Sequence, residues 1–196
     1  MNTDRKPLKD VVLLASGSGS NAENIITYFR KKNFPIRFHI ITNKHDAFVL
    51  ERAKQLHVPA EIVTKKQNEE GILHKRIKEL NPDLIVLAGY LLLFPASIIK
   101  EFPNKIINIH PALLPKFGGK GMFGSFVHEA VVANKETETG ITIHYVSEHY
   151  DEGATIFQAK TAVEEHDSPD DVANKVHQLE YEHFPQVIEQ LLENQD

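Results

Sequence analysis

The chain contains no cysteine, so disulfide bonds, thiolate zinc sites and cysteine nucleophiles are all excluded. Its eleven histidines leave metal sites built from imidazole and carboxylate ligands open as a class. However, neither H-x-x-x-H nor H-E-x-x-H occurs in the sequence, and we expect no bound metal. Because thiol chemistry is excluded, the histidines are the first candidates for catalytic side chains.

Long hydrophobic runs and an excess of positive charge are also missing. The N-terminal segment MNTDRKPLKD is polar and charged, and only five apolar residues follow it, too few for a signal peptide or a membrane span. The formal net charge of -5 offers no basic surface for nucleic acid. We therefore expect a cytoplasmic protein that binds neither membranes nor nucleic acid.

The composition is that of one globular domain. The chain has 196 residues, of which 41% are hydrophobic and 25% are charged, ordinary values for a protein with a buried core. This length suits a single domain covering residues 1–196, and no linker, repeat or low-complexity segment divides it. The oligomeric state is left open between a monomer and a homodimer.

Short apolar runs alternate with amphipathic stretches over the first two thirds of the chain. Strands are expected at 11–15, 36–42, 60–64, 83–89 and 105–109. Helices are expected among them at 22–33, 47–57 and 68–80. This alternation predicts a Rossmann-like α/β fold, in which a parallel sheet has helices on both faces.

The pattern changes after residue 124. The expected elements there are a helix at 125–135, strands at 139–147 and 154–163, and a helix at about 168–193. The two strands follow each other closely and are expected to form an antiparallel pair, while Ser168 and Pro169 suit the cap and first position of the last helix. The sequence therefore predicts a mixed sheet of about seven strands, mostly parallel.

A glycine-rich turn, SGSGSN at 16–21, connects the first expected strand to the first helix. Glycines allow a sharp turn and a close backbone approach, and a helix N-terminus presents free N–H groups to an anion. The spacing is neither G-x-G-x-x-G nor G-x-x-x-x-G-K, and no acidic residue ends the second strand. Two interpretations remain: a plain turn capped by Ser20 or Asn21, and a site for a monophosphate.

The segment IINIHPALLPKF at 106–117 places two polar side chains in an apolar run. Asn108 and His110 are two residues apart on an expected strand, so they point the same way. An amide donor beside an acid or base suits a carbonyl that becomes a tetrahedral oxyanion. Pro111 biases His110 towards extended geometry. The competing interpretation is a structural histidine beside an amide with satisfied hydrogen bonds.

A carboxylate that could orient His110 stands in the loop SEHYDEGA at 147–154. If Asp151 lies beside the imidazole, it is expected to raise the pKa of His110 and hold the protonated form. Spacing alone does not decide whether Asp151 reaches His110, and D-E-G is also common turn chemistry. A serine hydrolase is not indicated, because no G-x-S-x-G elbow occurs.

These segments, in this order, resemble the folate-dependent formyltransferases. The resembling stretches are VVLLASGSGSN, ITNKHDAFVLERA, PDLIVLAGYLLL, NIHPALLPKF, TGITIHYV, DEGATIFQAK and LEYEHFP, which span residues 11–185. N-x-H-P-x-L-L-P marks the wider family, and S-G-x-G-S-N points to a member that uses a ribonucleotide. The resemblance implies transfer of the formyl group of 10-formyltetrahydrofolate to the amine of glycinamide ribonucleotide, a step of purine biosynthesis.

The resemblance also implies a set of site residues. Asn108 and His110 would stabilise the oxyanion, and Asp151 would hold His110 charged and assist proton transfer. The phosphate and ribose of the ribonucleotide would contact Gly19, Ser20, Asn21, His177 and Glu180. The folate would contact Leu91, Leu92, Leu93, Phe94, Asn108, Ser147, Glu148, His149, Tyr150 and Asp151, mainly at backbone groups. Phosphate binding would then lie in about residues 1–100 and folate binding with catalysis in about 85–165.

Two segments depart from the family pattern. Many members carry an Arg where this chain has Leu92, so any contact of that side chain is lost, while backbone recognition of the pterin would remain. The loop KFGGKGMFGSFVHEA at 116–130 has four glycines between 118 and 124, which indicates either a mobile flap or a plain flexible connection. His144 matches a strand histidine near the catalytic centre, with a packed core histidine as the equal alternative.

Three other functions stay open as alternatives. A formyltetrahydrofolate hydrolase would use water in place of the amine, but that relative usually has an N-terminal regulatory domain and a second His where this chain has Pro111. A formyltransferase acting on initiator methionyl-tRNA would need a basic C-terminal domain. A non-catalytic sensor of phosphate ligands would keep the glycine turn without needing Asn108, His110 and Asp151 together.

Overall fold

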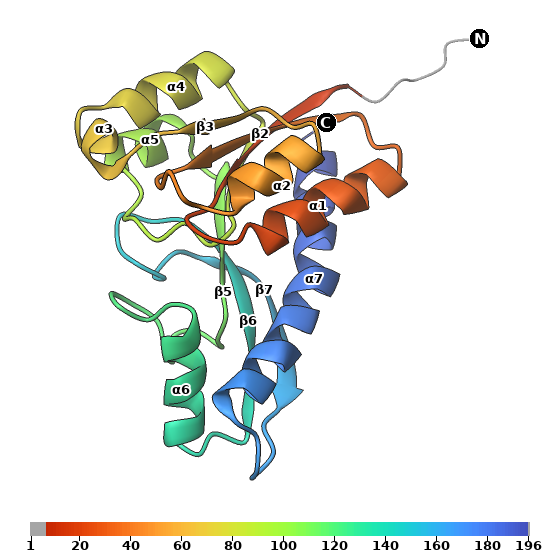
Figure 1. Cartoon of the computed structure of the whole chain (residues 1–196), viewed down its shortest axis with the longest axis vertical. Coiled ribbons are helices and arrows are strands. Elements are labelled where there is room, and N and C mark those ends of the chain that lie inside the picture. The colour runs from red at the N-terminus through yellow and green to blue at the C-terminus, as the bar shows by residue number, and fades with distance from the viewer. Residues whose placement is uncertain (1–6, 196) are drawn as a thin grey trace. The chain divides into compact units, whose positions relative to one another are not determined.

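The computed structural model describes residues 7–195, and Figure 1 follows the chain from end to end. These residues form two compact units. The first unit comprises residues 7–90 and 192–195, and the second comprises residues 91–191. No helix in residues 7–195 is both long enough and apolar enough to cross a membrane.

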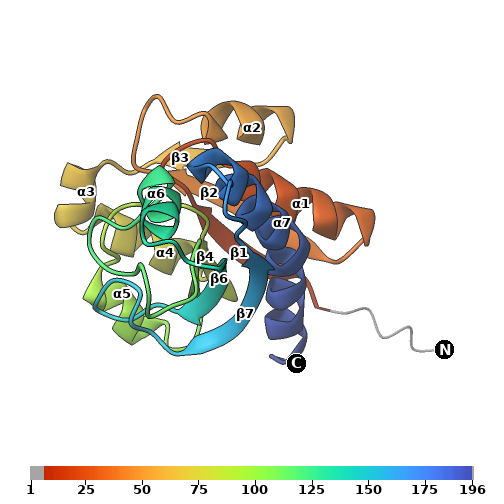
Figure 2. The ribbon, with the colours of Figure 1, turned by 90° about the horizontal axis from the view of Figure 1, so that it is seen from below.

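The first unit is a layer of parallel strands between helices. Its strands are β1 (Lys9–Leu14), β2 (Ile36–Thr42), β3 (Ala60–Ile62) and β4 (Leu84–Leu87), in the spatial order β3-β2-β1-β4. Its helices are α1 (Ser20–Lys31), α2 (Val49–Gln55), α3 (Lys65–Glu69) and α4 (Ile72–Leu80). The pairings of β1 with β2, β1 with β4 and β2 with β3 are all parallel. Helices α1 and α2 cover one face and α4 the other (Figure 1, Figure 2), which confirms the predicted layering.

The core of the first unit explains its apolar runs. Strand β4 is buried along its whole length, and β1 is buried at five of its six residues. Strands buried on both faces need continuous apolar sequence rather than alternation. Helix α1 turns Ala22, Ile25, Ile26 and Phe29 into the same core, at the spacing of one helical face.

The helices differ from the prediction in two places. The single helix expected at 68–80 is two helices, because Gly71 adopts a φ of 82° between α3 and α4. Thr64 starts α3 with a capping box, in which its side chain accepts from the backbone of Gln67 and the side chain of Gln67 accepts from the backbone of Thr64. Helix α5 (Ala96–Glu101) was not predicted, since its six residues are too few to show a helical period.

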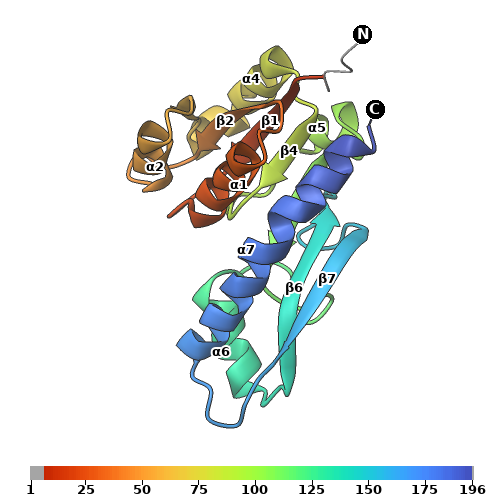
Figure 3. The same cartoon turned by 90° about the vertical axis from the view of Figure 1, so that its right-hand side faces the viewer.

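The second unit is antiparallel. Besides α5, its elements are β5 (Ile106–His110), α6 (Ser125–Ala133), β6 (Glu138–Tyr145), β7 (Thr155–Ala162) and α7 (Pro169–Glu193). The predicted pairing of β6 with β7 is confirmed, and β5 also pairs antiparallel with β6. Figure 3 shows α7 running along β6 and β7, with α6 beside its first half.

The predicted start of α7 is also confirmed. The side chain of Ser168 accepts from the backbone N–H of Asp171 at 3.2 Å, and the Asp171 carboxylate accepts from the Ser168 backbone at 2.9 Å. Pro169 occupies the first helical position, where its missing N–H has no intrahelical acceptor to lose. The reciprocal bonds fix where the chain leaves β7 and begins the long helix.

The predicted fold class, α/β with a mixed sheet of seven strands, is confirmed. Seven strands occur in the described part of the chain, four of them parallel in the first unit. The antiparallel part has one strand more than expected, because β5 pairs with β6. A five-residue apolar strand carries no signal for the direction of its neighbour, so this difference could not be read from the sequence.

Candidate active site

Asn108 and His110 lie on β5, at the end of the strand nearer its carboxyl terminus. In the antiparallel register with β6, Asn108 faces His144 and His110 faces Thr142. Residues opposite each other in such a pair project to the same face. The side chains of Asn108, His110 and His144 therefore share one side of these two strands, as the spacing of Asn108 and His110 predicted.

The loop after β6 brings Asp151 to this face. One carboxylate oxygen of Asp151 lies 3.5 Å from His110 Nδ1, and the other lies 3.6 Å from His144 Nε2. Asn108 Nδ2 lies 3.5 Å from Asp151 Oδ1 and 3.2 Å from His144 Nε2. The expected approach of Asp151 to His110 is thus present in the structure. Asn108, His110, His144 and Asp151 are called the polar cluster below.

Two backbone groups from the segment after Pro115 complete the polar cluster. His110 Nε2 lies 2.7 Å from the carbonyl oxygen of Phe117, so this nitrogen carries a proton and donates it to the carbonyl. The N–H of Gly119 donates to Asp151 Oδ2 at 2.9 Å. The glycine-rich flap at 118–124 is therefore tied at its beginning to both His110 and Asp151. His110 Nδ1, which lies 3.5 Å from Asp151, is the ring nitrogen left to titrate.

The pKa of His110 differs from the expectation. Its side chain is only 4% exposed, and this burial lowers the pKa below the ordinary value for histidine. Asp151 and the Phe117 carbonyl raise the pKa, and the neighbouring His144 lowers it, but burial prevails. The raising effect expected of Asp151 is therefore present, but burial outweighs it. In the site without substrate, the neutral form of His110 is favoured.

Asp151 is the charged member of the polar cluster. Burial raises the pKa of Asp151, but the hydrogen bond from His144, the charge of His110 and the Gly119 N–H outweigh it, so the pKa lies below its ordinary value. The backbone of Asp151 has a φ of 57°, a conformation that aspartate tolerates better than most residues. An ionised carboxylate is thus held among two imidazoles and an amide, an arrangement suited to stabilising and moving protons.

The predicted folate segments differ in how much side chain they expose. Leu91 and Leu93 are 40% and 47% exposed, whereas Phe94 is 3% exposed and belongs to the core. A ligand at Phe94 would therefore meet mainly its backbone. In the loop 147–151, Ser147 Oγ donates to the carbonyl of His149 at 3.1 Å, and Glu148 pairs with Lys100 of α5 at 3.5 Å.

The glycine-rich turn of the first unit is held by α2. The N–H of Val49 donates to the carbonyl of Gly17 at 3.1 Å, and Arg52 Nε donates to the carbonyl of Ser18 at 2.8 Å. Gly19, at φ 72°, precedes α1 and provides no side-chain cap. The capping role considered for Ser20 or Asn21 is therefore absent, because the helix begins at Ser20. The N–H groups of the first turn have no intrahelical acceptor, which suits an anion.

Two further predicted residues lie on α7, and they differ in exposure. Glu180 is buried, whereas His177 is exposed and stacks on the ring of Tyr181 at 6.2 Å between centroids. Their spacing of three residues places them on one face of the helix. That face therefore offers a buried carboxylate and an exposed imidazole.

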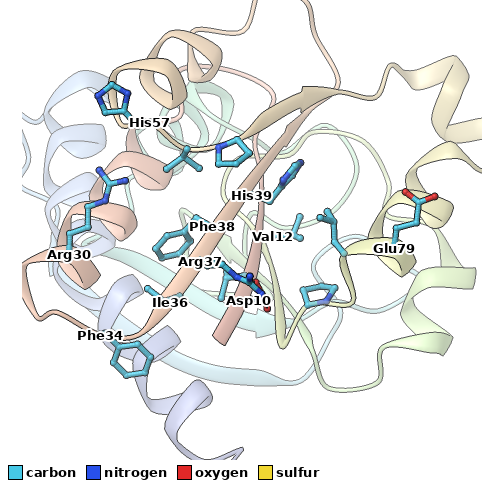
Figure 4. A pocket seen from close by; sticks show the side chains of 15 residues that line it. Asp10, Val12, Arg30, Phe34, Ile36, Arg37, Phe38, His39, His57 and Glu79 are labelled. Atoms are coloured by element: carbon cyan, nitrogen blue, oxygen red, sulfur yellow. Dashed lines mark hydrogen bonds and ion pairs between the residues drawn. The ribbon is translucent and has the colours of Figure 1, made fainter. Parts of the chain in front are cut away.

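A groove of about 530 Å³ lies elsewhere in the first unit (Figure 4). It follows the amino ends of β1 and β2 and is lined by residues such as Phe34 and Phe38. Arg37 and Asp10 close part of it with an ion pair of 2.7 Å. Ligands of open α/β sheets bind beyond the carboxyl ends of the strands, where the glycine turn follows β1. The groove is therefore not the predicted phosphate site.

Three participants at or near the site were not found from the sequence. The Phe117 carbonyl and the Gly119 N–H are backbone groups, which leave no mark beyond the glycines themselves. His128 of α6 is buried and lies close enough to His110 for the charge of His110 to lower its pKa. Its position on an apolar helix face gave no signal that separates it from a core histidine.

Comparison with known sequences identifies one family. Residues 9–188 of this chain match the model of the family described as "Formyl transferase". A phosphoribosylglycinamide formyltransferase of Bacillus subtilis is 35% identical over 94% of this chain and 95% of its own length. The phosphoribosylglycinamide formyltransferase of Escherichia coli is 32% identical over 91% of this chain and 85% of its own length.

Comparison with solved structures gives the same result. The glycinamide ribonucleotide transformylase 1 of Symbiobacterium toebii superposes with a TM-score of 0.88 at 30% identity, covering 97% of this chain and 90% of its own. The phosphoribosylglycinamide formyltransferase of Bacillus halodurans superposes with a TM-score of 0.84 at 33% identity, covering 96% and 97%. These values extend the similarity over both units of the chain.

Proposed function

The chain belongs to the formyl transferase family and is an enzyme of formyl transfer, and we propose that it moves the formyl group of 10-formyltetrahydrofolate to the primary amine of glycinamide ribonucleotide. The family expected from the sequence is confirmed by the match over residues 9–188. Relatives named phosphoribosylglycinamide formyltransferase along almost the whole chain support this choice of substrates. The reaction is a step of purine biosynthesis, which we assign to the cytoplasm.

The single observation that carries the catalytic proposal is the polar cluster. The amide of Asn108 and the imidazole of His110, both on β5, each lie 3.5 Å from the carboxylate of Asp151 in the loop after β6. Attack of the amine on the formyl carbon moves the carbonyl electron pair onto oxygen. We assign Asn108 Nδ2–H and protonated His110 Nδ1–H as the donors that stabilise this oxyanion. The sensor function, which needs no such group of side chains, is not supported by this arrangement.

The pKa of His110 gives the site its selectivity for the transition state. Burial disfavours a charged ring, while Asp151 favours it. The negative charge that develops on the formyl oxygen adds a second favourable partner at the moment of reaction. Protonated His110 is therefore stabilised more when the oxyanion forms than when the neutral formyl group is bound, which lowers the barrier.

Asp151 is assigned to proton transfer and to orientation. The attacking nitrogen must lose a proton after it bonds to carbon, and the N10 nitrogen of the folate must gain one when its bond to carbon breaks. An ionised carboxylate with a pKa below its ordinary value, held by Gly119 and His144, can accept the first proton and pass it on. The same carboxylate orients His110 Nδ1 toward the reacting groups.

The remaining contacts are assigned by family resemblance. The N–H groups at Gly19, Ser20 and Asn21 would hold the phosphate, and His177 and Glu180 the ribose. The folate would lie against backbone groups of the segments 91–94 and 147–151. Leu92 replaces the arginine that many members carry, so pterin recognition at that position would rest on the backbone alone.

The proposal is tested by mixing the purified protein with both substrates and measuring the formation of tetrahydrofolate. We expect tetrahydrofolate to appear only when glycinamide ribonucleotide is present, in amounts equal to the formylated product. Equal formation with and without the ribonucleotide would identify a hydrolase, because water then replaces the amine. Absence of turnover in both reactions would reject formyl transfer to this amine.

A further inference from the structure

His128, on α6, is a buried histidine outside the polar cluster. Its side chain is 4% exposed. Its Nδ1 is buried and has no hydrogen-bond partner in the part of the chain that the structure describes. Burying a polar atom without a partner destabilises a fold, so most buried side-chain nitrogens are hydrogen-bonded. This unpaired atom is the observation from which the inference starts.

The neighbours of His128 belong to the site. Its ring lies 6.3 Å from that of His177 on α7, at 86° to it, and His177 in turn stacks on exposed Tyr181. His110 is also close enough for its charge to affect His128. His128 is therefore within interaction range of both the catalytic imidazole and the exposed His177, whose helix face is assigned to the ribose.

The ring of His128 is neutral at physiological pH. Burial lowers the pKa of His128 to about 4, with further lowering by His177 and His110. A neutral imidazole has one donor and one acceptor nitrogen, which suits an uncharged amide better than a phosphate or carboxylate. It also places no positive charge beside an amine that must stay unprotonated to attack.

We propose that Nδ1 of His128 hydrogen-bonds the glycinamide arm of the ribonucleotide and is a further substrate-binding residue. This inference rests on the proposed function. The arm joins the ribose, assigned to His177 and Glu180, to the amine that reacts beside His110. A side chain that is near both His110 and His177 and has an unpaired nitrogen is placed to meet the amide of that arm.

Two variants separate this role from core packing. His128→Phe keeps a ring of similar size and removes both nitrogens, so the thermal midpoint is expected to be unchanged or higher. The KM for glycinamide ribonucleotide is expected to rise about tenfold, while the KM for 10-formyltetrahydrofolate stays the same. His128→Asn is smaller and expected to be less stable, yet it keeps a polar atom near the position of Nδ1. Its KM for the ribonucleotide is expected to stay close to that of the wild type.

The decisive result is the order of the two variants. His128→Phe is expected to be the more stable variant but to bind the ribonucleotide more weakly, and His128→Asn is expected to show the opposite. A KM that follows the thermal midpoint across the variants, or a Phe variant with unchanged KM, overturns the inference. If His128→Phe does not fold, His128→Gln replaces it, since Gln carries its amide near the Nε2 position and is expected to show the raised KM. His166→Phe, at an exposed loop position, is the matched control.

Failure of this inference is distinct from failure of the proposed function. Wild-type protein that does not formylate glycinamide ribonucleotide rejects the function before any variant is compared. Wild-type turnover with the same ribonucleotide KM in the wild type and in His128→Phe rejects only the role of His128. Titration calorimetry with glycinamide ribonucleotide alone gives the same comparison without turnover.

Discussion

The glycine-rich turn of the first unit and the polar cluster of the second unit are built in opposite ways. The turn is held by main-chain carbonyls of Gly17 and Ser18, which accept from Val49 and Arg52. The polar cluster is a set of buried and partly buried side-chain atoms, with backbone groups only as supports. The glycine-rich turn therefore depends on the conformation of the backbone, and the polar cluster depends on particular side-chain groups.

This difference determines what each site tolerates. A backbone site is sensitive to added atoms, and its requirement is a missing Cβ at Gly19. A side-chain site is sensitive to removed atoms, and its requirement is particular nitrogen and oxygen atoms at Asn108, His110 and Asp151. Substitutions should therefore impair the turn mainly through folding and ligand affinity, and the polar cluster mainly through the chemical step.

The largest effect is expected for His110→Ala. The substitution removes a donor to the oxyanion, so kcat should fall about 10³-fold, or about 4 kcal/mol of transition-state stabilisation. The KM for the ribonucleotide should change much less, which a steady-state assay of tetrahydrofolate formation measures. His166→Ala, at an exposed position of the same unit, serves as the control. A rate near that of the wild type would remove His110 from the chemistry.

Asp151→Asn should cost somewhat less, about 100-fold in kcat, and also change the pH dependence. Asp151 raises the pKa of His110, so its neutralisation lowers that pKa further. If protonated His110 is the active form, activity falls as pH rises through its pKa, and this alkaline limb should move to lower pH. Profiles of kcat/KM against pH measure the shift. Glu152→Gln, in the same loop, should leave the limb in place, and an unmoved limb in Asp151→Asn would contradict the coupling.

A smaller effect, and of a different kind, is expected for Gly19→Ala. The φ of 72° is unfavourable for alanine, and its Cβ would lie 2.9 Å from the backbone Cα of Val49. Stability should fall by about 1–3 kcal/mol, and ribonucleotide affinity should fall with it. Urea unfolding and a ribonucleotide titration measure the two. At Gly17 a Cβ would meet nothing within 4 Å, so Gly17→Ala is the control. Equal behaviour of both variants would refute the steric argument.

The smallest effect is expected for Ser20→Ala. The serine side chain makes only a 3.5 Å contact with Ser18, and the phosphate is assigned to the backbone N–H. The KM for the ribonucleotide should rise less than about threefold, under about 1 kcal/mol. The same steady-state assay measures it. A rise of more than about tenfold would show that the turn uses side chains, and the contrast with the polar cluster would no longer hold.

The parts of the fold with strong periodicity could be predicted from the sequence. The apolar runs of β1, β2 and β4 and the spacing of Ile25, Ile26 and Phe29 in α1 gave the parallel layer. The short helix α5 and the pairing direction of β5 could not be predicted, because five or six residues carry too little pattern. The break at Gly71 was visible as a glycine, but helical spacing on both sides outweighed it.

The candidate site was predictable where residues share a strand and unpredictable where a loop must fold back. Asn108 and His110 share a face because strand side chains alternate. The reach of Asp151 to His110 depends on the conformation of the loop after β6, which includes a left-handed backbone at Asp151 itself. The direction of the pKa shift of His110 depends on burial, and burial is a property of the assembled unit rather than of neighbouring residues.

The way the flap begins has a consequence for how this enzyme can vary. The segment contacts His110 and Asp151 through one carbonyl, at Phe117, and one N–H, at Gly119, so these contacts use backbone groups and not side chains, although the φ of 95° at Gly119 favours glycine there. Residues 120–124 are not among these contacts. Insertions, deletions and exchanges at the tip of the flap can therefore accumulate, or be introduced by design, without a change in the reacting groups. The backbone contacts with His110 and Asp151 and the tip of the flap can therefore vary separately within one short segment.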